Sequence, residues 1–304
     1  MYDLIIIGGG PAAIAAGVYA ARKKIKLLLI TDGWGGQSIV SADIRNFIGT
    51  KSISGFDWAQ MLESHLRDQE DIAIIDDDKA AKVEEKGKGF MVITEQGKLF
   101  ETRYILVCSG SRRRKINVPG EKEFDGKGVA YCSTCDAPLF KDKVVAVLGG
   151  GNAGLEAAID LLPYAAKIYL MEYAEVLRGD PVTREKVQQS DKVEIITMAQ
   201  TIDIAGDKTV TGLNYKDRKT GEAKHLDLGG VFVEIGSIPN ADFAKNLVQV
   251  NQFGEIIVDP KTQKTSRDGI WAAGDVSDVI YKQNNIAMGD AVKAVLNIYD
   301  ALNR

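Results

Sequence analysis

Cysteine and histidine are scarce in this sequence, which has three cysteines and two histidines among 304 residues. Cys108, Cys132 and Cys135 are too few for the disulfide framework of a small secreted protein. A structural zinc site uses about four cysteine or histidine ligands, usually in spaced pairs, whereas Cys108, His65 and His225 each stand alone. We therefore expect no metal site, and the Cys-x-x-Cys spacing of Cys132 and Cys135 favours redox chemistry.

An excess of positive charge is also absent, because 38 lysines and arginines face 42 aspartates and glutamates, for a formal charge of −4. Nucleic-acid-binding proteins usually carry a basic stripe, so we expect no nucleic-acid partner. The uncharged stretch 4–21 approaches the length of a membrane span, but its first half contains three glycines and a proline, and Asp3 precedes it. It fits neither a span nor a signal peptide, and we expect a cytoplasmic protein without a membrane anchor.

Glycine is the one enriched residue type, with 31 of 304 positions. The length predicts about two domains, and the composition excludes a disordered, collagen-like or coiled-coil chain. Seven of the glycines belong to a weak internal repeat, in which residues 5–16 (IIIGGGPAAIAA) correspond to residues 146–158 (AVLGGGNAGLEAA). Each copy follows an apolar run, precedes an alanine-rich segment of helical character and leads to a second apolar run. The pattern predicts strand, glycine turn, helix and strand, twice over.

The glycine turns match the G-x-G-x-x-G/A pattern of dinucleotide-binding folds. The first glycine permits a tight turn, the second lets a pyrophosphate approach the backbone, and the third position must be small so that helix and strand can pack. The pyrophosphate then lies at a helix N-terminus, where free N–H groups favour anions. In the first copy the three positions are Gly8, Gly10 and Ala13. In the second copy they are Gly149, Gly151 and Gly154. Two such sites in one chain indicate a flavin and a nicotinamide cofactor.

Further short apolar runs predict additional strands, separated by polar, glycine-bearing stretches. They are residues 72–75, 90–94, 104–107, 193–196, 231–235, 256–258 and 270–273. Crossings between domains are expected at the turn 118–120 and near Pro239-Asn240.

Over essentially its whole length the chain resembles the low-molecular-weight thioredoxin reductases, and also the reductase core of the flavoprotein component of bacterial alkyl hydroperoxide reductase. Seven short motifs, specific in their order and spacing, carry the resemblance. They are GGGPAAIAA (8–16), GGQ (35–37), CSTCD (132–136), GGGNAGLEAA (149–158), GSIPN (236–240), WAAGD (271–275) and KQ with AMGDA (282–291).

The resemblance implies an α/β protein with two Rossmann-like dinucleotide-binding domains, of the two-domain FAD/NAD(P) pyridine nucleotide-disulfide oxidoreductase type. Residues 1–113 and 243–304 are expected to form a discontinuous FAD domain. Residues 114–242 are expected to form an inserted NAD(P)H domain that carries the redox disulfide. The resemblance also implies a homodimer and an inserted domain that swivels between two states.

For the reactive pair, the resemblance implies that Cys135 faces the flavin, that Cys132 attacks the partner's disulfide, and that Asp136 is the acid. We expect the pair to lie on a first helical turn, where the helix dipole lowers a thiol pKa. An acid is needed to protonate the leaving thiolate. Taken without the resemblance, Asp136 fits a helix start equally well.

For the FAD site, the resemblance places Asp275 on the ribitol side and Gln283 against the ring, at a helix expected over 282–291. Lys282 stands where the family usually has arginine, and a lysine ammonium lacks the fork with which arginine makes a bidentate contact. Other residues are expected to line the same site: Pro11, Ala12, Thr31, Asp32, Gly36, Gln37, Asn46, Gly110 and Gly274.

For the nicotinamide site, Asn152 and Gly236 are expected to join the second glycine motif. Glu172 lies 23 residues after Gly149, where an acid binds the ribose 2′-hydroxyl and repels a 2′-phosphate. NADPH-using relatives have a basic cluster at this place, so we expect NADH rather than NADPH. The alternative is that Glu172 only ends a strand in solvent.

The leading hypothesis is an enzyme that passes electrons from NADH through FAD and the Cys132–Cys135 disulfide to a thioredoxin or a thioredoxin/glutaredoxin-like protein. We expect that partner on a separate chain, since this sequence begins at its first strand. One alternative is a related flavoprotein driven by ferredoxin or oxygen, although such relatives often lose the second glycine motif. Ferredoxin–NAD(P) reductase of the same fold lacks Cys-x-x-Cys. A flavin-bound redox sensor without turnover is a further alternative.

Overall fold

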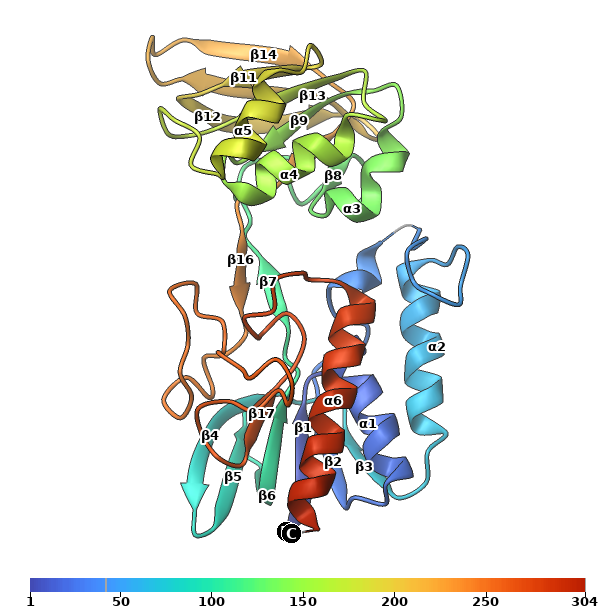
Figure 1. The fold of residues 1–304 in the computed structure, drawn as a ribbon. Coiled ribbons are helices and arrows are strands. Elements are labelled where there is room, and N and C mark those ends of the chain that lie inside the picture. The colour runs from blue at the N-terminus through green and yellow to red at the C-terminus, as the bar shows by residue number, and fades with distance from the viewer. Residues whose placement is uncertain (42, 304) are drawn as a thin grey trace. The chain divides into compact units, whose positions relative to one another are not determined.

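The computed structural model describes residues 1–41 and 43–303 and divides the chain into two compact units (Figure 1). One unit is Met1–Arg112 with Ile238–Arg304, and the other is Arg113–Ser237. The chain crosses between them in strands β7 (Ser111–Arg113) and β16 (Ser237–Pro239), which pair with each other in a two-stranded sheet.

Of the two crossings expected from the sequence, the one near Pro239-Asn240 agrees with β16, whereas the one at 118–120 does not. The expected domain boundary at 113/114 lies one residue after the observed boundary at 112/113. The expected boundary at 242/243 lies five residues after the observed boundary at 237/238. The turn 118–120 is not a crossing but belongs to the second unit, where the Pro119 carbonyl accepts a hydrogen bond from the Ile204 amide. A Pro-Gly pair marks a turn, but it does not reveal whether the chain leaves a domain there.

The first unit is built on a mixed sheet with the strand order β3-β2-β1-β6-β5-β4, and β17 also pairs with β6. Its first three strands and β17 run parallel to β6, whereas β5 and β4 form an antiparallel edge. The strands are β1 (Tyr2–Ile7), β2 (Leu27–Ile30), β3 (Ile72–Ile75), β4 (Ala80–Lys86), β5 (Gly89–Thr94), β6 (Leu99–Val107) and β17 (Ile270–Ala272). Every residue of β2 and the last four of β1 are buried, as expected for parallel strands covered on both faces.

Helices α1 (Pro11–Arg22) and α6 (Asn284–Leu302) lie side by side against this sheet, near α2 (Gly55–Arg67) (Figure 1). Ser54 caps α2 by accepting a hydrogen bond from the Asp57 amide. A short 3₁₀ turn, η1 (Gly36–Val40), precedes α2. Helix α6 is longer than the expected 282–291 segment because alanine and aliphatic residues continue its buried stripe to Ile298. The strand expected over 256–258 is wrong, because Ile256 forms only isolated bridges, to Val250 and Ser277.

The second unit repeats the parallel architecture with a five-stranded sheet in the order β11-β10-β9-β15-β8. Its strands are β8 (Val129–Ala130), β9 (Val144–Leu148), β10 (Lys167–Met171), β11 (Val193–Ile196) and β15 (Val231–Val233). Its helical elements are α3 (Ser133–Asp136), η2 (Ala137–Phe140), α4 (Asn152–Leu161) and α5 (Pro181–Gln188).

An antiparallel sheet of β12 (Ala199–Gly206), β13 (Val210–Asp217) and β14 (Ala223–Asp227) completes the second unit. This sheet was not predicted from the sequence, because its strands contain no continuous apolar run. One face of β13 is buried through alternate residues such as Leu213 and Tyr215, and the residues between them are polar.

Replacing Gly289 by alanine should stabilise the first unit by about 0.5–1 kcal/mol, because glycine loses more backbone entropy than alanine within a helix. Gly289 lies exposed inside α6, and an added Cβ would meet no atom within 4 Å. Urea denaturation measures the change. The control is Gly274→Ala, which should destabilise, since Gly274 has a φ of +76° and an added Cβ would lie 3.2 Å from the Ala12 Cβ. A loss of stability in Gly289→Ala would contradict this expectation.

Candidate active site

The first glycine turn connects β1 to α1 and is held tightly against β6. Gly8 has a φ of +129°, and a Cβ added there would lie 2.3 Å from the Cys108 carbonyl oxygen. Gly10 is the N-cap of α1, Pro11 follows at the first helical position, and Ala13 is fully buried. A Cβ at Gly10 would find its nearest atom, the Gly36 Cα, 3.8 Å away. The turn therefore presents open backbone at a helix N-terminus, as a pyrophosphate requires.

Residues from both ends of the chain meet beside this turn. The Gln37 amide donates to the Ser111 hydroxyl at 3.1 Å and to the Asp275 carboxylate at 3.3 Å. The Asn46 amide donates to the Gln283 carbonyl oxygen at 3.2 Å. Four of the sequence-predicted FAD residues thus pair across the chain, close to Gly36 and Gly274, although more than 200 residues separate their segments.

The buried Oε1 atom of Gln37 accepts no hydrogen bond from any residue that the structure describes. A buried acceptor without a partner is costly unless a ligand or water supplies a donor. Together with the open backbone at Gly10, this atom shows that the residues fit a bound flavin nucleotide, whose ring carries an N–H donor.

Other predicted FAD residues have partners within the protein. Thr31 is buried and donates to the Gly33 carbonyl, and Asp32 is exposed, with Lys79 at 3.8 Å. The Lys282 ammonium donates to the Ser277 carbonyl at 2.6 Å and pairs with Glu255 at 3.0 Å. Gly110 has a φ of +63°, and its carbonyl accepts from the Asn240 amide. A contact from these side chains to FAD remains a prediction.

The second glycine turn connects β9 to α4 with the same geometry. Gly149 has a φ of +122°, and an added Cβ would lie 2.4 Å from the Glu234 carbonyl oxygen. A Cβ at Gly154 would lie 1.7 Å from the Gly149 carbonyl oxygen, so only glycine fits there. A Cβ at Gly151 would meet nothing within 4 Å, which leaves that backbone open to a ligand. Asn152 accepts a hydrogen bond from the Asp180 amide at 2.7 Å.

Glu172 follows β10 and folds back onto the second glycine turn. Its carboxylate accepts hydrogen bonds from the Gly150 amide at 2.6 Å and from the Ala174 amide at 2.7 Å. Arg218, which the sequence did not suggest for this site, stacks on the Tyr173 ring at 3.9 Å and donates a hydrogen bond to the Tyr173 carbonyl. Arg218 lies 45 residues further along the chain, so only the fold reveals this contact.

Cys132 and Cys135 form a disulfide at the start of α3. Cys132 is the N-cap of this helix, which has only four residues before the 3₁₀ turn η2 begins. A helix dipole was expected to stabilise a thiolate here, but the single turn of α3 supplies few aligned peptide dipoles. Cys108 is buried in the other unit, and burial raises the pKa of its thiol, so it is a packed residue.

Asp136 ends α3 and lies partly buried close to the disulfide. Burial raises its pKa to about 6, against the opposing influence of Arg113. Since the folded pKa lies above the ordinary value of 3.8, the fold favours the neutral form. Its contribution to stability is complete below pH 3.8 and is lost as the pH rises through about 6. Near neutral pH this carboxyl therefore exchanges a proton readily.

Two further carboxyl groups near the disulfide were not found from the sequence. Asp160, from α4, accepts hydrogen bonds from the Ser133 hydroxyl at 2.9 Å and from the Thr134 hydroxyl at 3.2 Å. Glu234 is buried directly after β15. The available signal was a lone acid inside the apolar run 231–235, because buried acids are rare unless they have partners.

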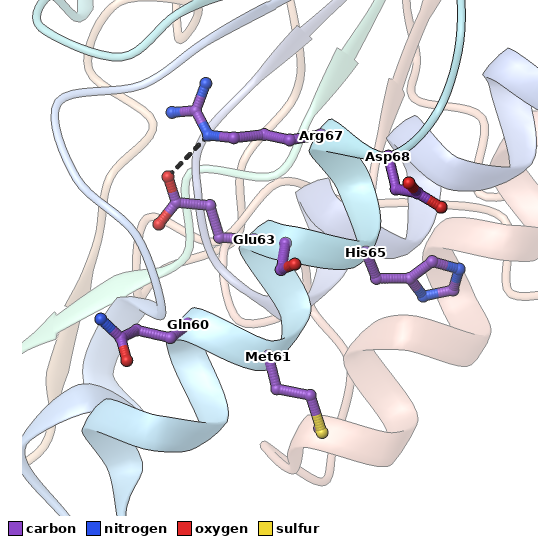
Figure 2. Close-up of a pocket in the computed structure, with 7 residues that line it drawn as sticks. Gln60, Met61, Glu63, His65, Arg67 and Asp68 are labelled. Atoms are coloured by element: carbon purple, nitrogen blue, oxygen red, sulfur yellow. Dashed lines mark hydrogen bonds and ion pairs between the residues drawn. The ribbon is translucent and has the colours of Figure 1, made fainter.

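A surface hollow with a volume of about 760 Å³ lies along α2 (Figure 2). Its lining side chains, among them Met61 and His65, all belong to α2 and the residue that follows it, and Glu63 pairs with Arg67 at 2.8 Å. Because one helix and the residue after it supply all of its lining, this hollow does not bring side chains from different elements together. Within residues 1–41 and 43–303, no cluster of histidine, cysteine and acidic side chains could hold a metal ion. Among the described helices, none is both long and apolar enough to span a membrane.

The class of protein follows from three features of the described residues. Two glycine turns lie at helix N-termini, the unpartnered Gln37 oxygen lies beside the first turn, and a disulfide belongs to the same unit as the second turn. The chain belongs to the pyridine nucleotide-disulphide oxidoreductase family, whose model matches residues 2–291. These are flavoprotein disulfide oxidoreductases akin to thioredoxin reductase, and membership implies FAD and a pyridine nucleotide. The expected resemblance and fold class are confirmed.

Among individual proteins, the chain is 42% identical over 303 residues to an NADH dehydrogenase of Bacillus subtilis, covering all of this chain and 59% of that protein. It is 44% identical over 306 residues to an alkyl hydroperoxide reductase component of Xanthomonas campestris, covering all of this chain and 57% of that component. The crystal structure of thioredoxin reductase from Streptococcus pyogenes matches with a TM-score of 0.92 at 32% identity, over 100% of this chain and 98% of that one. The chain thus spans less than two thirds of the curated relatives' length.

Proposed function

We propose that this chain is a thioredoxin reductase-like enzyme that uses NADH to reduce the Cys132–Cys135 disulfide and then the disulfide of a thioredoxin- or glutaredoxin-like protein. The observation that carries the proposal is the formed disulfide in the same unit as an intact second glycine turn. FAD, when bound at the first turn, supplies a two-electron carrier between nicotinamide and disulfide. The family resemblance also implies that the enzyme is a homodimer, and light scattering measures this oligomeric state directly.

Each residue of the reactive pair has a separate task in this proposal. Cys135 is the sulfur on the flavin side, and Cys132 attacks the partner's disulfide, as the family pattern assigns them. Asp136, with a pKa raised to about 6 by burial, gives a proton to the thiolate that leaves. The two histidines lie elsewhere, since His65 is on α2 and His225 is on β14.

Replacing Asp136 by asparagine should slow reduction of an alkyl disulfide by about a hundredfold, because the leaving alkyl thiolate needs a proton. In the unmodified enzyme this acid-dependent rate should fall as the pH rises through about 6, where Asp136 loses its proton. Stopped-flow reduction of hydroxyethyl disulfide by the pre-reduced enzyme measures both effects. An aryl disulfide, whose leaving thiolate is stable, is the matched control and should react at nearly the original rate. Equal slowing of both substrates would count against an acid role.

The preference for NADH rests on Glu172. Its carboxylate is held beside the second glycine turn by the Gly150 amide, where it would accept a ribose 2′-hydroxyl and repel a 2′-phosphate. The name NADH dehydrogenase, carried by the Bacillus relative, supports the same nucleotide. Arg218 is engaged with the ring and carbonyl of Tyr173.

Anaerobic mixing of the FAD-loaded protein with NADH and, separately, with NADPH tests the donor. NADH should bleach the oxidised flavin quickly and NADPH slowly, and the double substitution Glu172→Arg with Tyr173→Arg should move the ratio of kcat/KM values toward NADPH. Fast bleaching by NADPH would overturn the nucleotide preference and leave the enzyme class in place. Absence of bleaching by either would favour a ferredoxin- or oxygen-linked flavoprotein or a redox sensor.

A further inference from the structure

Glu234 connects the second glycine turn to the disulfide. It directly follows β15 and is 9% exposed. Its amide donates to the Leu148 carbonyl, and its carbonyl oxygen is the atom that a Cβ at Gly149 would meet at 2.4 Å. Strand β15 pairs in parallel with β8, the strand that leads into Cys132, so Glu234 lies at the same sheet edge as the disulfide. The backbone of Glu234 thus contacts the nucleotide turn, and its carboxylate lies beside the amide of Ser133, the first residue of the disulfide helix.

The charged groups around Glu234 come from three other elements. Arg113, on β7, attracts its carboxylate, whereas Asp136 on α3 and Asp160 on α4 repel it. Burial is the largest influence, and it raises the pKa of Glu234 to about 7. All these residues belong to the same unit as the disulfide. At neutral pH the carboxyl is therefore divided between its charged and neutral forms. The Ser133 amide that lies beside it is joined to Cys132 by a single peptide bond.

We propose that Glu234 is a positioning residue that takes up a proton when the Cys132–Cys135 bond is reduced and releases it when the bond re-forms. Reduction adds two electrons from the reduced flavin and breaks the Sγ–Sγ bond. With one proton taken up by sulfur, it leaves one thiol and one thiolate. A second proton then binds the Glu234 carboxylate, because the new negative charge on sulfur raises its proton affinity. Oxidation by the partner's disulfide removes the two electrons and returns both protons.

This inference deepens the proposed function and depends on Cys132–Cys135 being the redox pair. Its consequence is a thiolate whose abundance follows the charge of Glu234. The thiolate moves the pKa of Glu234 above its value of about 7 in the disulfide form; below that raised pKa the neutral carboxyl leaves the thiolate unopposed, and above it the carboxylate repels the thiolate and raises the apparent pKa of the thiol. Substitution of Glu234 by glutamine keeps the shape and the acceptor for the Ser133 amide but removes the titrating charge.

The test is the rate of iodoacetamide alkylation of the Cys132–Cys135 pair as a function of pH, after reduction with dithiothreitol, with the modified peptide quantified by mass spectrometry. Above the pH at which Glu234 ionises in the reduced protein, Glu234→Gln should react on the order of tenfold faster than the unmodified protein, and its profile should lack the inflection that this ionisation produces above about pH 7. Glu234→Asp, which retains a carboxyl, should restore the inflection. A purely structural role would not remove an inflection from the profile.

Glu194→Gln is the matched control. Glu194 is an exposed acid on β11, three strands from β15 in the same sheet, or about 14 Å at the usual strand spacing. That separation exceeds the screening length of about 8–10 Å, so its alkylation profile should match that of the unmodified protein. A Glu234→Gln profile that also matches the unmodified one would overturn the inference.

If circular dichroism shows that Glu234→Gln does not fold, Arg113→Gln provides the second variant. Loss of the Arg113 attraction should move the inflection to higher pH, and an inflection that stays in place would overturn the inference. Chemical reduction makes these measurements independent of electron supply. If neither nucleotide bleaches the flavin, only the proposed function is contradicted. If the alkylation profile of Glu234→Gln matches that of the unmodified protein, only the role of Glu234 is contradicted.

Discussion

Replacement of Cys135 by serine is expected to abolish reduction of a protein disulfide, with a loss of about a thousandfold or more. A serine hydroxyl cannot form the Cys132–Cys135 bond, so electrons on the flavin have no acceptor within the protein. Anaerobic bleaching of the flavin by NADH should remain at nearly the original rate, because the glycine turns are untouched. Thioredoxin-coupled NADH oxidation and stopped-flow absorbance measure the two rates on the same preparation.

Cys108→Ala is the matched control for the loss of a sulfur. Cys108 is 3% exposed, forms no disulfide and belongs to the other unit, so its removal should leave disulfide reduction within about twofold of the original rate. Two results would contradict the proposed roles. One is disulfide reduction that survives in Cys135→Ser, and the other is disulfide reduction that is lost in Cys108→Ala.

Replacement of Gly151 by alanine is expected to weaken nucleotide binding without lowering the free energy of unfolding. An added Cβ would meet no protein atom within 4 Å, and the φ of −85° suits alanine, so the free energy of unfolding should not fall. The same methyl group would occupy the space that the second glycine leaves for a pyrophosphate. Overpacking of this kind costs about 1–3 kcal/mol, so the KM for NADH should rise about tenfold to a hundredfold.

Gly154→Ala provides the contrast to Gly151→Ala. Its Cβ would lie 1.7 Å from the Gly149 carbonyl oxygen, so this variant should lose both stability and nucleotide binding. Gly289→Ala controls for the addition of a methyl group in open space, since it should leave the KM for NADH unchanged. Urea denaturation and steady-state kinetics on the three variants complete the comparison. An unchanged KM in Gly151→Ala would show that no pyrophosphate approaches this turn.

The parts of the molecule that could be predicted from the sequence are those in which a short run of residues is compatible with only one local structure. The two glycine turns were predicted at their observed positions, because a tight strand-to-helix turn admits few residues at Gly8 and Gly149. Parallel strands such as β1 and β2 were predicted because they are buried and consist of apolar runs, whereas the two-residue parallel strand β8 was not predicted. The antiparallel sheet over 199–227 was missed, since each of its strands mixes buried and exposed residues without such a run.

The carboxyl groups around the disulfide show where prediction from sequence ends. Asp136 was identified because it adjoins Cys135 in the sequence. Glu234 lies 99 residues beyond Cys135, and its role follows from burial and from the amide of Ser133. Arg218 is a similar case, because only the packing at the end of β13 brings it to Tyr173.

By itself, the sequence determined the class of chemistry: two dinucleotide turns and a pair of cysteines at a spacing that closes a small ring. These features depend on residues within a few positions of one another, where backbone geometry limits the choice. Only the tertiary structure decided the protonation of the site, the meeting of Gln37 with Asp275 and the place where the chain crosses between units. A pKa depends on burial and on charges from every neighbouring element, and those neighbours are set by the packing of segments far apart in the sequence.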